Sequence, residues 1–257
     1  SMGADAGDLN HDGYPEIFVT DMLPEPEERV KTVTTFENWE KYRLHLKNGY
    51  HHQFTRNTLQ LNRGDGRFSE IGRYAGVEAT DWSWAALMAD FDQDGHSDIF
   101  VANGIYQDLT NQDYIQQASS DEMVRRVTSG NNVDFKSLID LIPSNPVSNY
   151  MFAGQAGLRF ANRAGEWGLA EPSFSNGSAY GDLDNDGDLD LVVNNVNMEA
   201  FVYRNRASER GAGHWLQVAL SGAPPNTGGI GAQLSVWAGG RLHWREQMPQ
   251  RGFQSSV

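Results

Sequence analysis

The sequence predicts a mainly β fold of four-stranded sheets, and two repeated patterns predict it. An acidic loop of the form D-x-[DN]-x-D-G-x-x-[DE] occurs three times, and each copy runs directly into a short apolar stretch of strand-forming residues. A second pattern, which reads as two short strands around a turn, follows each copy in more or less degraded form. A strand, the loop, a second strand and this hairpin make about four strands, the size of one β-propeller blade.

The acidic loop places oxygen ligands at alternate positions, which is how proteins wrap a hard cation such as Ca²⁺. The glycine at the sixth position lets the backbone turn back with a positive φ angle. Side chains at positions one, three, five and nine, the carbonyl of position seven and a water complete a shell of six or seven oxygens. The predicted ligands are Asp8, Asn10, Asp12, Tyr14 and Glu16 in the first loop, Asp90, Asp92, Asp94, His96 and Asp98 in the second, and Asp182, Asp184, Asp186, Asp188 and Asp190 in the third.

The EF-hand loop begins in the same way but requires a bidentate Glu at the twelfth position and a helix to follow. Here the twelfth positions are Val19, Val101 and Val193, each inside a run of strand-forming residues. We therefore predict loops that close at the ninth residue. The alternative, that Asp, Asn and Gly act only as turn residues, explains one copy better than three. Because Asn10 replaces an aspartate, we expect the first of up to three Ca²⁺ sites to be the weakest.

The negative charge of the chain is concentrated in these loops. The formal net charge of the 257 residues is −14, and eleven ligand carboxylates account for all but three of these charges. Even with three bound Ca²⁺ ions the chain stays acidic, the wrong sign for a protein that binds a phosphate backbone. No Lys/Arg patch or basic-aromatic interleaving was recognised, so we expect no nucleic-acid partner. No apolar run is long enough to predict a transmembrane segment in this piece.

The chain has no cysteine, which excludes a disulfide framework and a thiolate zinc site. Calcium sites of a non-switching kind suit compartments where the ion is plentiful, so we expect an extracellular, cell-surface or periplasmic location. No signal peptide is visible, and Ser1 and Met2 resemble the remnant of a cleaved tag. An export signal is therefore expected to have been removed with the native N-terminus.

Along the chain, residues 57–71 read as a hairpin, with a weaker version at 149–160 and a shorter one at 200–205. Insertions at 21–52 and 105–148 contain helical patterns over 35–44, 121–127 and 135–142, and we expect them to lie across one face, where partners bind. Residues 213–220 and 234–237 read as strands around a glycine-rich turn. We therefore divide the chain into about three propeller blades over 1–210 and a partial β segment over 211–257.

These motifs resemble a known family. The loops and the strands after them resemble the FG-GAP/VCBS repeats of integrin-like β-propellers. Residues 181–195 and 214–236 resemble a propeller followed by an ASPIC/UnbV domain, as in the cartilage acidic protein-like family, and residues 47–62 and 81–95 are similar to multi-repeat surface proteins of Bacteroidetes-type bacteria. The resemblance implies a seven-bladed propeller with Ca²⁺ in the blade loops and no defined activity.

The chain has three recognisable units, whereas closure of a propeller generally needs at least four blades. The ASPIC/UnbV-like part also lacks its expected C-terminal half. We therefore expect a fragment of a longer protein, whose exposed blade edges favour self-association.

Other candidate sites are weaker. His51 and His52 point to opposite sides of an extended segment and have no carboxylate cluster beside them, which disfavours a transition-metal site. Trp82 and Trp84 fall on one face of a strand, where packing between blades is favoured over a sugar-stacking platform. Glycines at 228, 229 and 231 lack the strand-helix context of a nucleotide loop, so they are assigned to a turn.

No nucleophile elbow, HExxH motif or Cys-His pair is present, and loop carboxylates committed to a cation are poor general acids. The sequence therefore predicts a non-catalytic, calcium-stabilised β-propeller scaffold for extracellular protein or glycan binding and adhesion. The alternative is a polysaccharide-active lyase or hydrolase on the same scaffold, with Tyr50, His51, His52 and Arg56 as acid/base groups.

Overall fold

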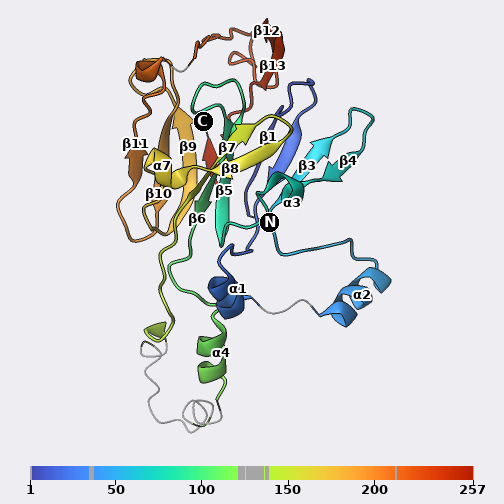
Figure 1. Ribbon diagram of the computed structural model, residues 1–257, viewed down its shortest axis with the longest axis vertical. Helices are drawn as coiled ribbons and strands as arrows, with labels where there is room; N and C mark the ends of the chain where they lie inside the picture. The colour runs from blue at the N-terminus through green and yellow to red at the C-terminus, as the bar shows by residue number, and fades with distance from the viewer. Residues whose placement is uncertain are drawn as a thin grey trace.

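A computed structural model describes residues 2–34, 38–120, 125, 136, 139–211 and 213–256. Of the helical pattern predicted over 121–127 only residue 125 is described, and of the pattern over 135–142 residues 135, 137 and 138 lie outside the described part. Over the described part the protein is mainly β, with several small antiparallel sheets and few helices (Figure 1).

The first sheet has four antiparallel strands in chain order: β1 (Ala4–Gly7), β2 (Glu16–Val19), β3 (Thr58–Asn62) and β4 (Phe68–Glu70). The first acidic loop joins β1 to β2, and the predicted hairpin at 57–71 forms β3 and β4. The order of strand, acidic loop, strand and hairpin is therefore confirmed for this unit.

The second sheet repeats this order with β5 (Ser83–Ala89), β6 (Asp98–Asn103), β7 (Tyr150–Gln155) and β8 (Arg159–Asn162). All six residues of β6 are buried. Its two faces contribute to different apolar clusters, one shared with the first sheet and one with the third. A strand covered on both faces reads as a continuous apolar run, as this one does.

The third sheet has three strands among the described residues: β9 (Ser175–Gly181), β10 (Asp190–Asn195) and β11 (Phe201–Tyr203). The short hairpin predicted after the third loop is a single strand here. The residues that follow β11 turn into the short 3₁₀ helix η1 (Ser208–Arg210) and do not return along the sheet.

The sheets pack through two apolar clusters. Phe18, Leu59 and Ile99 belong to the cluster between the first and second sheets, and Leu87, Phe100 and Val193 to the cluster between the second and third. The first strands are neighbours, because β5 contacts both β1 and β9. Since every acidic loop follows a first strand, this packing brings the three loops to the same end of the molecule.

The insertions leave from the opposite end, because each follows the second strand of its sheet. The first carries α1 (Glu27–Val33) and α2 (Trp39–Lys47), and the second carries α4 (Gln112–Ala118). In Figure 1 these three helices lie below the sheets, where α1 contacts α4 and α2 stands apart to the right. Of the helical pattern at 35–44, residues 35–37 lie outside the described part, and the rest begins α2. Two four-residue helices, α3 (Gly72–Ala75) and α7 (Ala164–Trp167), follow β4 and β8.

The C-terminal segment contains a hairpin of β12 (Gln233–Ala238) and β13 (Arg241–Glu246). The strand predicted over 234–237 is confirmed, but the strand predicted over 213–220 is wrong, because that segment forms no strand. It has no neighbouring strand to bond with, and Trp215, Leu216 and Val218 remain exposed. No helix among the described residues has the length and apolar character needed to cross a membrane.

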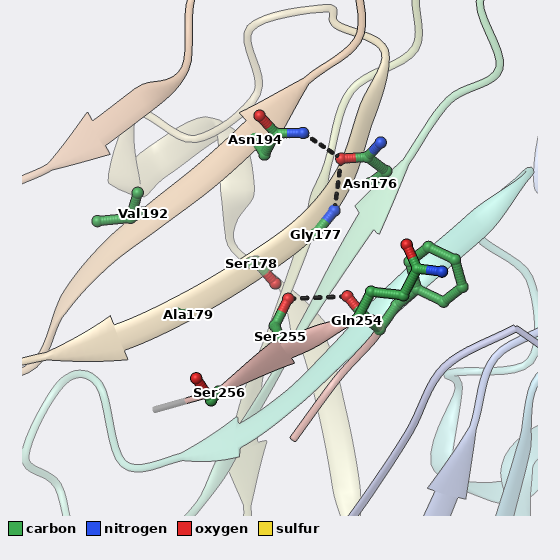
Figure 2. Close-up of a pocket in the computed structure, with 10 residues that line it drawn as sticks. Asn176, Gly177, Ser178, Ala179, Val192, Asn194, Gln254, Ser255 and Ser256 are labelled. Atoms are coloured by element: carbon green, nitrogen blue, oxygen red, sulfur yellow. Dashed lines mark hydrogen bonds between the residues drawn. The ribbon is translucent and has the colours of Figure 1, made fainter. Parts of the chain in front are cut away.

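The last residues form a two-stranded ribbon, β14 (Gln250–Arg251) and β15 (Ser255–Ser256), against the first strands of all three sheets. Gly252 pairs with Ala4 of β1 and lies beside Leu87 of β5. Ser255 lies beside Gly177 of β9, where the two segments line a hollow of about 370 Å³ (Figure 2). The C-terminal ribbon therefore contacts the first strand of each of the three sheets.

Candidate metal centres

The three acidic loops share one hydrogen-bond pattern, in which the first aspartate accepts from the backbone of the turn. In the second loop, Asp90 Oδ1 accepts from Asp94 N at 3.2 Å and Asp90 Oδ2 from Gly95 N at 3.0 Å. The equivalent pairs in the first and third loops lie within 2.9–3.2 Å. This pattern holds the first carboxylate in a fixed orientation toward the loop interior.

The turn needs two residues with positive φ. The sixth-position glycines, Gly13, Gly95 and Gly187, have φ between 84° and 92°. The fourth positions also have positive φ, but side chains occupy them: His11, Gln93 and Asn185. The glycine is visible in the sequence. The positive φ at the fourth position is not, because the three residues there are of different types and Gln93 is not a type that often adopts it.

The ninth-position carboxylate connects each loop to a later strand or to the segment beyond it. Asp98 Oδ2 accepts from Phe91 N at 2.8 Å within its loop, and Asp98 Oδ1 accepts from Gly154 N on β7 at 2.9 Å. Glu16 makes the equivalent contacts to Leu9 and Asn62, and Asp190 makes them to Leu183 and Asn205. All three carboxylates are buried, so each loop is closed by a carboxylate at the position that the sequence indicated.

In two loops the aspartates converge closely enough to hold a metal ion. Carboxylate oxygens of Asp90, Asp92 and Asp98 all lie within 4.8 Å of one another. The same is true of Asp182, Asp184 and Asp190 in the third loop. The first loop has Asn10 at the third position, so only Asp8 and Glu16 are carboxylates at the corresponding places. Two aspartate triads can therefore hold metal ions.

The electrostatics of these groups favour a bound cation. Burial is the main cause, and repulsion from neighbouring aspartates a smaller one, that raises the pKa of the Asp98 carboxyl to about 8 and that of the Asp90 carboxyl to about 6. Burial likewise raises the pKa of Glu16 to about 7. A divalent cation would offset both effects by supplying the opposite charge. The donor set, oxygen only and rich in carboxylates, fits a hard ion such as Ca²⁺.

The fifth position makes the same contact in all three loops, whereas the seventh differs in the third loop. The fifth-position carboxylates, Asp12, Asp94 and Asp186, each accept from the backbone N–H of the seventh residue. The carbonyls of Tyr14, His96 and Asp188 stay predicted ligands, since no contact in the structure tests them. Asp188 differs from the other two because its side chain is buried and its Oδ2 accepts from Ser208 N at 3.0 Å.

Comparison with protein families matches two parts of the chain. Residues 49–101 match the family model of the FG-GAP-like repeat, and residues 222–257 match the model described as ASPIC and UnbV. The chain carries an FG-GAP-like repeat and an ASPIC/UnbV segment. No curated protein matches the chain as a relative.

The FG-GAP-like repeat spans the boundary between two sheets. Its match includes β3 and β4 of the first sheet, then β5, the whole second acidic loop and most of β6. FG-GAP-like repeats generally belong to binding and adhesion domains. The ASPIC/UnbV match includes the hairpin of β12 and β13 and the ribbon of β14 and β15.

The C-terminal segment packs on the turn of every acidic loop. Its contacts come from Trp215, which precedes the ASPIC/UnbV match, and from Arg241 and Leu242 within it. A Cβ built on Gly13 would lie 3.2 Å from Leu242, and one on Gly95 would lie 3.3 Å from Arg241. On Gly187 it would lie 2.0 Å from the ring of Trp215. His11 Nδ1 also contacts Leu242 O at 2.8 Å. The loop glycines therefore serve close packing as well as the turn.

The residues of the alternative enzymatic hypothesis do not converge. Tyr50, His51 and His52 are exposed on the segment after α2. The hydroxyl of Tyr42 contacts His52. Arg56 is turned away from them, donates to Glu70 at 2.8 Å and lines a separate cleft. The four side chains therefore form no common acid/base site.

Trp82 and Trp84 lie close together, with ring centroids 6.4 Å apart, but the two rings contact different parts of the protein. Trp84 packs on Phe253 of the C-terminal ribbon at 5.0 Å and donates to Gly104 O. Trp82 lines the same cleft as Arg56. Sequence reasoning missed this cleft, whose walls come from segments far apart in the chain.

Proposed function

We propose that the three sheets are blades of a β-propeller and that each acidic loop binds one Ca²⁺ ion. The observation that carries this proposal is the repeated loop with identical hydrogen bonds at the same place in each sheet, between the first and second strands. Support for the propeller comes from the neighbouring first strands β1, β5 and β9, which occupy the places of innermost strands around an axis.

The proposed role of calcium is structural. Each ninth-position carboxylate is buried and already bonded to the backbone of two segments, so a bound ion would neutralise charge within a junction of the fold. A carboxylate that coordinates the ion is a poor general acid or base. The scaffold then carries binding surfaces, and the FG-GAP-like repeat supports a role in binding or adhesion to an extracellular protein or glycan.

The proposal includes a location outside the cytoplasm, because structural calcium sites of this kind fill where Ca²⁺ is abundant. It also places the propeller blades within residues 1–210 and the ASPIC/UnbV segment within 211–257. The open edges of the sheets, at β4, β8 and β11, are the surfaces through which self-association is expected.

Calorimetric titration of the metal-stripped protein with Ca²⁺ tests this function. We expect up to three ions to bind per chain, and the substitutions Asp98→Asn and Asp190→Asn each to remove one of them. The exposed Asp65→Asn on the turn between β3 and β4 is the matched control and should leave the stoichiometry unchanged. Absence of Ca²⁺ uptake by the folded protein would contradict the proposal.

A further inference from the structure

A cleft of about 620 Å³ lies at the insertion end of the molecule, away from the acidic loops. One wall comes from the first insertion, where Leu23 and Val30 face it. The other comes from Phe54 in the segment before β3, Arg73 in α3 and Trp82 directly before β5. The volume is within the range of sites that hold small molecules.

The cleft is held open by contacts between its walls. Leu23 O accepts from the backbone N–H of Thr80 at 2.8 Å and of Asp81 at 2.9 Å. Arg29 of α1 donates to Asp81 Oδ2 at 2.7 Å and, on its other side, to Asp108 Oδ1 at 2.8 Å. The first insertion is thereby fixed both to the sheets and to the second insertion. A site formed in advance loses less conformational entropy when a ligand binds.

One cation on the cleft wall is left without a counter-ion. Arg29 is neutralised by Asp81 and Asp108, and Arg56 pairs with Glu70 at 2.8 Å. Arg73 is exposed and makes no hydrogen bond or ion pair with any residue in the described part of the chain. A guanidinium with free donors favours a carboxylate, which it can bind through two parallel hydrogen bonds.

The remaining lining suits a molecule that presents both C–H and O–H groups. Phe54 and Trp82 offer aromatic surface, and the threonines at 34, 55 and 110 place hydroxyl groups around it. Aromatic faces beside polar donors are the combination that orients a sugar ring.

A row of aromatic rings leads out of the cleft along the first insertion. The ring of Phe54 stacks on Tyr42 at 5.6 Å, and Tyr42 stacks on Trp39 of α2 at 5.2 Å. Residues 39–56 contain four Lys or Arg and one acidic residue, although the whole chain has a net charge of −14. The net charge of the whole chain hides this local interleaving of basic and aromatic residues. Together with Arg73, this stretch beside the cleft favours a negatively charged ligand, while three glutamates at 25–28 carry negative charge elsewhere on the same insertion.

We propose that the cleft binds one uronic-acid unit of an acidic glycan. Arg73 holds the sugar carboxylate, Trp82 and the exposed edge of Phe54 contact its C–H groups, and neighbouring sugar units extend along the edges of the stacked rings of Tyr42 and Trp39. This assignment rests on the proposed binding function and names its ligand class. A single unpaired guanidinium suits one carboxylate per sugar better than a continuous phosphate backbone, which requires several cations.

Isothermal titration of the Ca²⁺-saturated protein with uronate trisaccharides, galacturonate and mannuronate, tests the assignment. Neutral trisaccharides that carry an alcohol in place of the carboxylate are the matched probes. We expect a uronate to bind at least about tenfold more tightly than its neutral counterpart, and Arg73→Gln to remove that difference. Phe54→Leu should weaken both probes by a similar factor, because it removes the aromatic face and leaves the charge.

Arg67→Gln is the control, since Arg67 is an exposed arginine on the turn between β3 and β4, paired with Asp65 outside the cleft. It should leave uronate binding unchanged. Equal binding by the wild type and Arg73→Gln would overturn the assignment. So would tighter, Arg73-dependent binding of an acidic peptide or a single-stranded oligonucleotide. If no uronate binds although EGTA still lowers the melting temperature, the glycan assignment alone fails and the calcium scaffold stands.

Discussion

The guanidinium of Arg204 lies 2.6 Å from a carboxylate oxygen of Asp184 in the third acidic loop. A second nitrogen of Arg204 lies 3.5 Å from Asp186 and 2.8 Å from Glu209. No cationic side chain makes such an ion pair with the carboxylates of the first two loops among the described residues. The third loop therefore has an internal cation that competes with a metal ion for Asp184.

Replacing Arg204 by glutamine should increase the Ca²⁺ affinity of the third loop. The ion pair is solvent-accessible and therefore weak, so we expect its loss to raise the affinity by no more than about fivefold. Calorimetric titration measures it, with Arg63→Gln on the first sheet as a control that removes the same charge elsewhere. Unchanged or weaker binding at the third loop would show that Arg204 does not compete with the ion.

The first loop should gain affinity from Asn10→Asp. At present the Asn10 amide donates to Asp12 at 2.9 Å and contributes no charge. A carboxylate there completes the triad found in the other loops, and we expect the affinity of this loop to rise roughly three- to tenfold. Asn194→Asp, an exposed position on β10, adds the same charge away from the loop and should have little effect. Three equal sites in the unmodified protein would contradict the prediction.

The packing of the C-terminal segment on the loops predicts different costs for two glycine substitutions. Gly187 and Gly157 both have positive φ, 92° and 79°, but a Cβ would meet the Trp215 ring only at Gly187. Gly157→Ala should cost about 1 kcal/mol of unfolding free energy from backbone strain alone. Gly187→Ala should cost at least about 1 kcal/mol more, because Trp215 must move. Equal costs in urea unfolding would mean that Trp215 does not pack on this loop in solution.

Arg29 should be among the most sensitive positions in the insertions. Its side chain is largely buried between two buried carboxylates, and Arg29→Met would leave Asp81 and Asp108 without a counter-ion. We expect a loss of about 3–5 kcal/mol in unfolding free energy. Arg163→Gln, which breaks an exposed pair with Glu166, is the control and should cost under about 1 kcal/mol. If Arg29→Met loses no more stability than this control, the ion pairs of Arg29 with Asp81 and Asp108 do not stabilise the insertions.

Local patterns were sufficient to predict most of the sheets. The loop glycine, the run of strand formers after it and the turn at 63–67 each act over a few residues, so two four-stranded units followed from sequence alone. The strand expected over 213–220 did not form, because alternating apolar residues need a neighbouring strand, which no local pattern reveals. Its Trp215 packs on Gly187, a contact between distant parts of the chain.

The two aspartate triads were predictable because the spacing of their residues within one loop determines their geometry. The cleft could not be predicted from the sequence, because Leu23, Arg73 and Trp82 meet only after the first insertion folds back on the sheets. The sequence also did not indicate that Arg204 competes with a metal ion for the Asp184 carboxylate. It follows β11, and only the pairing of β10 with β11 brings it to Asp184.

Thermal unfolding with and without EGTA tests the central claim, that the acidic loops stabilise the fold by binding Ca²⁺. At a hundredfold excess of Ca²⁺ over the dissociation constant, each site contributes about 3 kcal/mol to the stability of the native state. We therefore predict that EGTA lowers the melting temperature by at least about 10 °C, and that added Ca²⁺ restores it. A melting temperature that EGTA leaves unchanged would contradict the account.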